Sequence, residues 1–191
     1  MSVELMHYDD HLLPEIGQVY WNKPDASWAR IYSCIGRHED SCLEFSQVVF
    51  RFQTSLVVRD HLFRYRHASM AAAGLRYNEV ETFVLPDEAT PEARAVLARA
   101  YDAALQAYHE LRDEKVRREV ARYLTPCGVQ VTYCMAFNIR SLAKNVFPER
   151  LSKGAQPETR AVAQEMWRLV HAKNPALWGC IRGALGPELL F

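Results

Sequence analysis

Arg64, Arg66 and Arg76 lie close together in the chain and follow the apolar run at residues 56–58. Arginine presents a planar fork of donors that matches phosphate and carbonyl oxygens, and it does not lose its charge. Lysine and arginine together number 23, as do aspartate and glutamate, so no net charge draws the protein toward nucleic acid. A local group of arginines in a neutral chain therefore predicts an anionic ligand held in a fixed orientation.

The segment that contains these arginines, residues 64–77, carries a resemblance to a known family. It is similar to the signature of the flavin-dependent thymidylate synthases, which reads R-H-R-x-x-S-x-N-E-x-S-x-R-Y. The residues that match this signature are Arg64, Arg66, Ser69, Arg76 and Tyr77. The family's histidine, asparagine, glutamate and second serine are replaced by Tyr65, Ala71, Ala72 and Gly74.

Three further motifs of the same family follow in the family's order. R-E-x-A-R-x-x-L-P matches residues 118–126, with Thr125 in place of the leucine. N-x-R-S-L matches residues 138–142 and is followed by Arg150, and A-Q-x-E-I-R resembles residues 155–160. The gap before Arg150 is one residue longer than in the family and contains Pro148, so Asn145 stands in for a family asparagine. The matched motifs lie between about residues 41 and 160.

The resemblance implies roles for individual side chains. Arg150 matches an arginine that lies against the uracil ring, and it is the residue that we expect to be catalytic. The residues implied in binding the nucleotide are His61, Arg64, Gly74, Arg76, Arg122 and Arg150, of which Arg76 and Arg122 hold the phosphate. The residues implied in binding the flavin are Ser41, Arg64, Tyr65, Arg66, Asn138 and Asn145.

Methylation of C5 of uracil is difficult because this carbon is a poor nucleophile. A fixed arginine such as Arg150 can raise the electron density at C5 by stabilising negative charge on the ring carbonyls. The resemblance implies this route without a cysteine nucleophile, with FAD as cofactor, methylenetetrahydrofolate as carbon donor and NADPH as reductant. No G-x-G-x-x-G is present, so the flavin is not expected in a dinucleotide-binding fold. The family's enzymes are homotetramers whose active sites combine residues from several subunits.

The replaced stretch at residues 71–74 bears on the choice of substrate. In the family it lies along the sugar and phosphate, and here it has lost a carboxylate and a hydroxyl. A smaller wall leaves room for a ribose 2′-hydroxyl, so we expect UMP to be a substrate, beside dUMP. The chain thus resembles most the family's variants that methylate UMP and dUMP in nucleoside-antibiotic biosynthesis. Three alternatives stay open: ordinary dTMP synthesis, a flavin- or nucleotide-binding homologue without turnover, and an arginine-rich helix that contacts RNA.

Other residue types favour a cytoplasmic protein without a metal. Five cysteines lie scattered without a C-x-x-C pair, which indicates reduced thiols. Seven histidines show no H-E-x-x-H spacing, and we expect no metal site. The first residues do not form a signal peptide, and no apolar run reaches the roughly 18–20 residues of a membrane span.

Secondary structure is expected to alternate irregularly over one domain, residues 1–191. Residues 1–25 are predicted to form an extended arm with a short strand. Residues 27–35 are apolar, and a helix there is one of the possibilities. Residues 47–52 and 80–84 are predicted to be strands. Ser55 is suited to cap a helix at 56–64, within which Asp60 and Arg64 would pair.

The second half of the chain is expected to be mainly helical. Thr90 starts a long helix that runs to about residue 123, with a break near 112–114. Residues 128–137 are either a buried strand or the start of a helix. Asn138 then precedes a short helix that ends at Pro148, and a last helix covers residues 158–173. This mixture predicts an α+β fold, with a mainly antiparallel central sheet and flanking helices.

Overall fold

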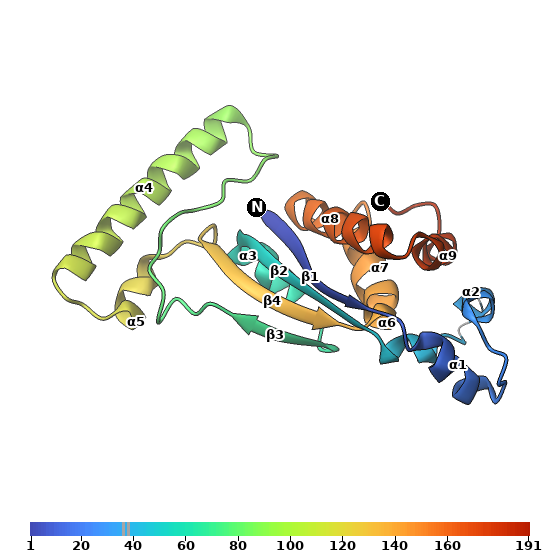
Figure 1. The fold of residues 1–191 in the computed structure, drawn as a ribbon. Coiled ribbons are helices and arrows are strands. Elements are labelled where there is room, and N and C mark those ends of the chain that lie inside the picture. The colour runs from blue at the N-terminus through green and yellow to red at the C-terminus, as the bar shows by residue number, and fades with distance from the viewer. Residues whose placement is uncertain (36, 38) are drawn as a thin grey trace. The chain divides into compact units, whose positions relative to one another are not determined.

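The computed structural model describes residues 1–35, 37 and 39–191 (Figure 1). Within these residues, four strands form one sheet in the order β1–β2–β4–β3, and neighbouring strands run antiparallel. The strands are β1 (Ser2–Asp9), β2 (Gln47–Ser55), β3 (Ala68–Ala72) and β4 (Gln130–Phe137). Helices flank this sheet, which confirms the predicted α+β class.

β4 shows why the apolar segment at 128–137 is a strand and not a helix. Its buried side chains alternate with more exposed ones, and the buried set consists of Val131, Tyr133, Met135 and Phe137, each at most 3% exposed. A period of two matches the pleat of a strand with one covered face. β2 shows the same alternation, with Val48, Phe50, Phe52 and Thr54 buried. The buried aromatic rings of these two strands meet in pairs, Phe52 with Tyr133 and Phe50 with Phe137.

The chain divides into two compact units, and the first comprises Met1–Ser2, Phe52–Arg64 and Ala71–Tyr133. Its helices are α3 (Leu56–Leu62), α4 (Pro91–Asp113) and α5 (Arg118–Ala121), and α5 continues into a 3-10 turn at Arg122–Leu124. Ser55 and Thr90 cap α3 and α4 as predicted, because their hydroxyls accept hydrogen bonds from the amides of Val58 and Ala93 at 3.3 Å each. The predicted break near residues 112–114 is also confirmed, since α4 ends at Asp113.

Two predictions for the first unit are wrong. Residues 80–84 do not form a strand and contribute one isolated bridge, from Phe83 to Val129. The ring of Phe83 stacks on Tyr101 of α4 at 4.7 Å. This apolar residue therefore packs against a helix, where the prediction had it in a strand paired along its length. The expected pair of Asp60 with Arg64 is not formed, because α3 ends at Leu62 and Asp60 pairs with Arg59 at 2.8 Å.

The second unit comprises Val3–Arg51, Tyr65–Met70 and Cys134–Phe191. Its elements include α1 (Leu13–Trp21), α2 (Trp28–Ile35), the 3-10 helix η1 (Ser41–Phe45), α8 (Pro157–Lys173) and α9 (Pro175–Leu185). The helix left open at 27–35 is present, and α8 buries Val162, Met166 and Val170 at the predicted spacing. The expected arm at residues 1–25 needs correction, because only β1 is extended and a proline-started helix, α1, follows it.

The helical segment after β4 runs further than predicted. Asn138 caps it, accepting a hydrogen bond at Oδ1 from the amide of Ser141 at 2.7 Å. Helical backbone then continues through α6 (Ile139–Ser141), a π turn (Leu142–Val146) and α7 (Phe147–Arg150), so Pro148 does not end the helix.

The π turn explains how Pro148 is accommodated. In a regular helix, its ring would meet the carbonyl four residues earlier, at Lys144, and its missing N–H would break the ladder. Lys144 lies within the π turn, and the backbone hydrogen bonds of such a turn span one residue more than those of an α-helix. Phe147 and Leu151 are both fully buried and anchor the end of this segment.

In the described part of the chain, no helix has the length and apolar character needed to cross a membrane.

Candidate functional site

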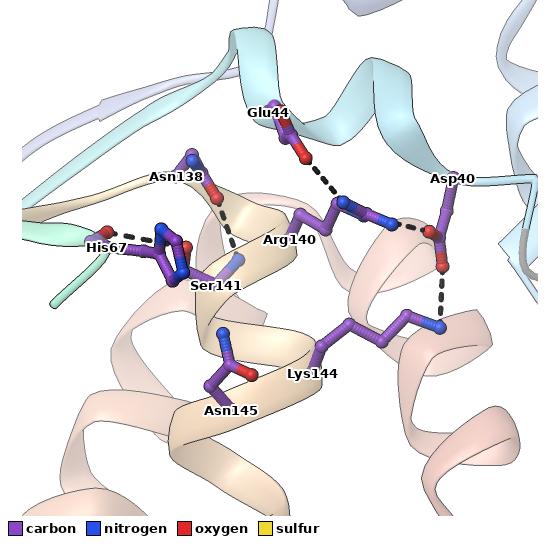
Figure 2. A pocket seen from close by; sticks show the side chains of 8 residues that line it. All are labelled: Asp40, Glu44, His67, Asn138, Arg140, Ser141, Lys144 and Asn145. Atoms are coloured by element: carbon purple, nitrogen blue, oxygen red, sulfur yellow. Dashed lines mark hydrogen bonds and ion pairs between the residues drawn. The ribbon is translucent and has the colours of Figure 1, made fainter. Parts of the chain in front are cut away.

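Residues expected to bind the flavin meet at an open pocket of about 540 Å³ in the second unit (Figure 2). Its lining is polar throughout and consists of Asp40, Glu44, His67, Asn138, Arg140, Ser141, Lys144 and Asn145. Asn138 and Asn145 are the two asparagines that we expect to bind the flavin, and the structure brings them to one cavity. The volume falls within the roughly 300–1,000 Å³ typical of small-molecule sites.

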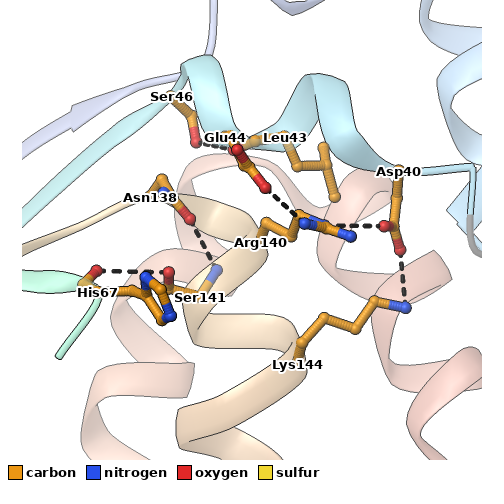
Figure 3. Close-up of polar contacts among 9 residues, drawn as sticks. All are labelled: Asp40, Leu43, Glu44, Ser46, His67, Asn138, Arg140, Ser141 and Lys144. Atoms are coloured by element: carbon orange, nitrogen blue, oxygen red, sulfur yellow. Dashed lines mark hydrogen bonds and ion pairs between the residues drawn. The ribbon is translucent and has the colours of Figure 1, made fainter. Parts of the chain in front are cut away.

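A buried carboxylate organises one wall of this pocket (Figure 3). Asp40, just before η1, is 2% exposed, accepts a hydrogen bond from Arg140 Nε at 3.2 Å and forms an ion pair with Lys144 Nζ at 2.7 Å. A carboxylate withdrawn from water is stable only when charges of opposite sign compensate it. Arg140 also pairs with Glu44, and hydrogen bonds to Glu44 and Asp40 raise the pKa of its guanidinium above the usual value. The two cations of the pocket are therefore held in place by its two acids.

The opposite wall offers uncommitted polar groups. Within the described residues, the side-chain amide of Asn145 has no hydrogen-bond partner, and Figure 2 shows it beside the pocket. A primary amide carries two donors and an acceptor, which suits the edge of a heteroaromatic ring. The side-chain oxygen of Asn138 accepts the hydrogen bond that caps the helix, and its NH₂ group is left as a donor. The wall is completed by Ser141, whose hydroxyl donates to the carbonyl of His67 at 3.4 Å.

A neighbouring hollow of about 330 Å³ adds Arg66 to this site. It shares Glu44, His67 and Asn138 with the first pocket and is also lined by Ser69. Arg66 is exposed, and its guanidinium has no partner among the residues that the structure describes. A cation without a partner beside a polar pocket is suited to an anionic part of a ligand.

Arg150 and Tyr65, expected to contact the uracil ring and the flavin, lie against each other in the second unit. The guanidinium carbon of Arg150 is 5.2 Å from the centre of the Tyr65 ring. The Tyr65 hydroxyl donates to Glu149 at 2.9 Å, and the same carboxylate lies 3.6 Å from Arg150. Burial, and then the bond to Glu149, raise the pKa of Tyr65 well above its ordinary value, so its phenol stays protonated near neutrality.

The first unit contains a separate basic pocket of about 420 Å³. Its lining consists of Arg76, Tyr77, Arg112, Lys115, Arg117, Arg118 and Glu119. Glu119 pairs with Arg76 at 3.0 Å and with Arg117 at 2.8 Å. Lys115 has no partner among the described residues. Five cations around one lining acid give an excess of positive charge that suits a phosphate.

A second acid, Glu79, contacts two of the arginines that line this basic pocket. It pairs with Arg118 at 2.5 Å and with Arg112 at 3.5 Å. Its pKa lies below the usual value, chiefly because the Tyr108 hydroxyl donates to it at 2.8 Å. Arg112 and Arg118 are thus held by a carboxylate that stays ionised.

The remaining expected residues lie in both units and are not among the residues that line the three pockets described above. Arg122 begins a 3-10 turn, and Arg64 follows the end of α3; both side chains are exposed and unpartnered among the described residues. Gly74 is exposed with open space around it, and His61 is half-buried on α3. Ser41 is half-buried at the start of η1. Their binding roles stay predictions.

Several residues of these sites were missed by the sequence analysis. Asp40 and Lys144 line the pocket with Asn138 and Asn145, and Glu149 contacts Tyr65, but no motif named these three residues. The run at residues 115–118, with three cations in four positions, was a signal for the basic pocket. Among the described residues, no group of three histidine, cysteine, aspartate or glutamate side chains is placed to hold a metal ion.

The fold is shared with a solved uridylate methylase. It superposes on the crystal structure of a UMP/dUMP methylase, PolB, from Streptomyces cacaoi bound with 5-Br dUMP, with a TM-score of 0.86. That match has 21% sequence identity and covers 95% of this chain and 94% of the other. The structure of PolB bound with 5-Br UMP gives a TM-score of 0.84, at 21% identity, over 96% of this chain and 94% of the other.

Residues 8–176 match the model of the Thy1 family, described as thymidylate synthase complementing protein, and the chain belongs to that family. The flavin-dependent thymidylate synthase of Saccharolobus solfataricus is 32% identical over 143 residues, which make up 72% of this chain and 55% of that protein. The one from Geobacter sulfurreducens is 32% identical over 158 residues, 75% of this chain and 66% of that protein. The chain thus spans little more than half the length of the first of these relatives, and the resemblance found in its motifs is confirmed.

Proposed function

We propose that this protein is a flavin-dependent enzyme that methylates C5 of a uridine monophosphate, with UMP as a substrate beside dUMP. The observation that carries the proposal is the polar pocket that Asn138 and Asn145 line together, because the family pattern implies flavin contacts for both. Membership of the Thy1 family and the fold shared with a UMP/dUMP methylase support it. The proposed carbon donor is methylenetetrahydrofolate, the proposed reductant is NADPH, and the proposed location is the cytoplasm.

The donors and acceptors of the second unit fit a flavin. The free amide of Asn145 and the NH₂ group of Asn138 match the carbonyls and ring nitrogens of an isoalloxazine edge. Arg66 stands beside them as a cation for the pyrophosphate. Arg64, Tyr65 and Ser41 complete the set that would hold FAD. When bound, FAD supplies the redox chemistry that a methylation without a cysteine nucleophile requires.

The basic pocket of the first unit fits the nucleotide phosphate. Arg76 lines it, and the family pattern implies phosphate contacts for Arg76 and Arg122. Lys115 adds a cation without a partner among the described residues. Arg64, His61 and Gly74 complete the proposed nucleotide contacts. Arg150 then acts on the uracil ring, where a fixed cation lowers the free energy of negative charge on the carbonyl oxygens.

A homotetramer is part of the proposal, and α4 supports it. Of the residues Pro91–Asp113, all of which the structure describes, Tyr108 alone is buried, and Val96 is 56% exposed. The apolar stripe formed by Leu97, Tyr101 and Leu105 stays half-exposed. A helix of this length whose apolar stripe is only partly covered within the chain is suited to packing against another subunit. Light scattering on the purified protein should give four times the mass of one chain.

The function is tested by combining flavin content with turnover. Purified protein should be yellow, with the absorbance of bound FAD, and should release tritium from [5-³H]UMP when methylenetetrahydrofolate and NADPH are supplied. Release from dUMP alone would show ordinary dTMP synthesis, and bound FAD without release would show a homologue without turnover. Absence of flavin binding would overturn the proposal, and salt-sensitive RNA binding would favour the remaining alternative.

Replacing Arg122 or Arg76 by alanine should raise the KM for the nucleotide by about 10- to 100-fold with little change in kcat. A phosphate contact is made equally in the ground state and the transition state, so its loss weakens binding without slowing chemistry. Steady-state kinetics of tritium release measure both constants. Arg168→Ala is the control, because Arg168 pairs with Glu165 on α8. An unchanged KM in both variants would exclude Arg76 and Arg122 from the phosphate site.

A further inference from the structure

Tyr65 stands where the family signature has a histidine, and its side chain makes contacts within the protein besides the flavin contact proposed for it. The side chain is 9% exposed, and its ring and hydroxyl are both engaged inside the second unit. The ring lies under the guanidinium of Arg150, at 5.2 Å, and the hydroxyl reaches Glu149 at 2.9 Å. Tyr65 therefore contacts two consecutive residues of α7 through different parts of one side chain.

These contacts restrict Arg150 from two directions. The face of an aromatic ring attracts a cation placed over it, which limits the guanidinium to a plane near the ring. Glu149 lies 3.6 Å from the terminal nitrogen of Arg150 and biases its position within that plane. Glu149 is itself held by the Tyr65 hydroxyl, although 61% of its side chain is exposed. An arginine of many rotamers thus keeps little freedom, and its side chain is 19% exposed.

The backbone beneath Arg150 is equally restricted. α7 follows the π turn, and the fully buried Phe147 and Leu151 flank Glu149 and Arg150 on either side. The direction in which Arg150 leaves the helix is thereby set by the fold, and Tyr65 and Glu149 act on the rest of the side chain.

We propose that Tyr65 and Glu149 are positioning residues that fix the guanidinium of Arg150 for its action on the uracil ring. This inference rests on the proposed function, because that function gives Arg150 its role. Stabilising charge as it develops requires a donor that does not reorganise during the reaction. The Tyr65–Glu149 pair supplies that rigidity, where the family's histidine would present a shorter ring that also changes charge near neutral pH.

Two substitutions at Tyr65 separate the contribution of its hydroxyl from that of its ring. Tyr65→Phe keeps the ring and removes the bond to Glu149, and kcat should fall about tenfold with the KM for the nucleotide nearly unchanged. Tyr65→Leu removes the ring as well, and kcat should fall about a hundredfold. In an Arg150→Ala background, Tyr65→Phe should have no further effect, since the two residues act as one unit. An equal loss in both backgrounds overturns the proposal.

A second readout does not depend on turnover. In ¹⁵N NMR spectra of the FAD-loaded protein, the Nε–Hε resonance of Arg150 should carry a ring-current shift that Tyr65→Leu abolishes and Tyr65→Phe retains. A resonance that does not move in Tyr65→Leu overturns the proposal. If that resonance moves and Arg150→Ala keeps full activity, the positioning is supported and the proposed role of Arg150 fails instead.

Tyr8→Phe is the matched control for the loss of a hydroxyl. Tyr8 lies in the same unit, donates to Asp10 at 2.9 Å and accepts from Trp178 Nε1 at 3.0 Å, and no motif includes it. Its removal should lower the melting temperature without changing kcat or the Arg150 resonance. A tenfold fall of kcat in Tyr8→Phe would show that any lost hydroxyl in this unit slows the reaction, which would overturn the assignment to Tyr65.

Discussion

Arg150→Ala should lower kcat by about 10²- to 10³-fold, the largest effect that we expect of any single substitution in this chain. The loss follows from removing a fixed cation from the place where the uracil carbonyls gain negative charge. The kcat of Arg150→Lys should lie between those of the wild type and of Arg150→Ala, because lysine keeps the charge and lacks the planar fork of donors. Tritium release from [5-³H]UMP, measured with saturating substrates, gives kcat for each variant.

The control for this prediction is another arginine packed on an aromatic ring. Arg182 lies over Phe191 at 4.7 Å, in the same unit and outside the family motifs, so Arg182→Ala removes a similar contact without touching the site. Circular dichroism should show both variants folded. Wild-type turnover in folded Arg150→Ala would exclude Arg150 from the chemistry, and an equal loss in Arg182→Ala would trace the effect to general packing.

Local signals in the sequence predicted the ends of elements well. Ser55, Thr90 and Asn138 were expected at or before helix starts, and each accepts a hydrogen bond from an amide three residues later. These caps depend on a few adjacent residues, which is why they can be read from the sequence. The failures depend on distant partners. The alternation at residues 80–84 is that of a strand, but a ladder needs a second strand along its whole length, and Phe83 instead stacks on Tyr101.

Pro148 shows a different limit of sequence reasoning. Its ring and missing N–H are strong signals for a helix end. In the structure the helix continues past Pro148 because a π turn precedes it, and no residue type in the sequence predicts such a turn. The same holds for the site. The motifs predicted Asn138 and Asn145, but the buried Asp40 that holds Lys144 lies far away in sequence, and its role depends on the fold. The contact of Tyr65 with Glu149, 84 positions later, was equally out of reach.

Restoring the family's polar residues by Ala71→Asn, Ala72→Glu and Gly74→Ser should lower kcat/KM for UMP about 100-fold relative to dUMP. The larger side chains refill the space that we assign to the ribose 2′-hydroxyl. Folding should not suffer, because residues 71–74 are exposed and a Cβ added at Gly74 meets no atom within 4 Å. Competition between differently labelled UMP and dUMP in one reaction measures the ratio of kcat/KM directly.

Gly154→Ser controls for the added hydroxyl, since Gly154 is also exposed with open space around it and lies outside the sites described. It should leave the ratio of UMP to dUMP unchanged. Ala72→Glu also brings a negative charge toward the phosphate, and repulsion by that charge would weaken the binding of UMP and dUMP alike. A fall of kcat/KM confined to UMP would therefore indicate steric exclusion of the 2′-hydroxyl. A triple variant that still takes UMP as readily as the wild type would show that residues 71–74 do not form the sugar wall. Exclusive use of dUMP by the wild type would remove the reason for the substitution altogether.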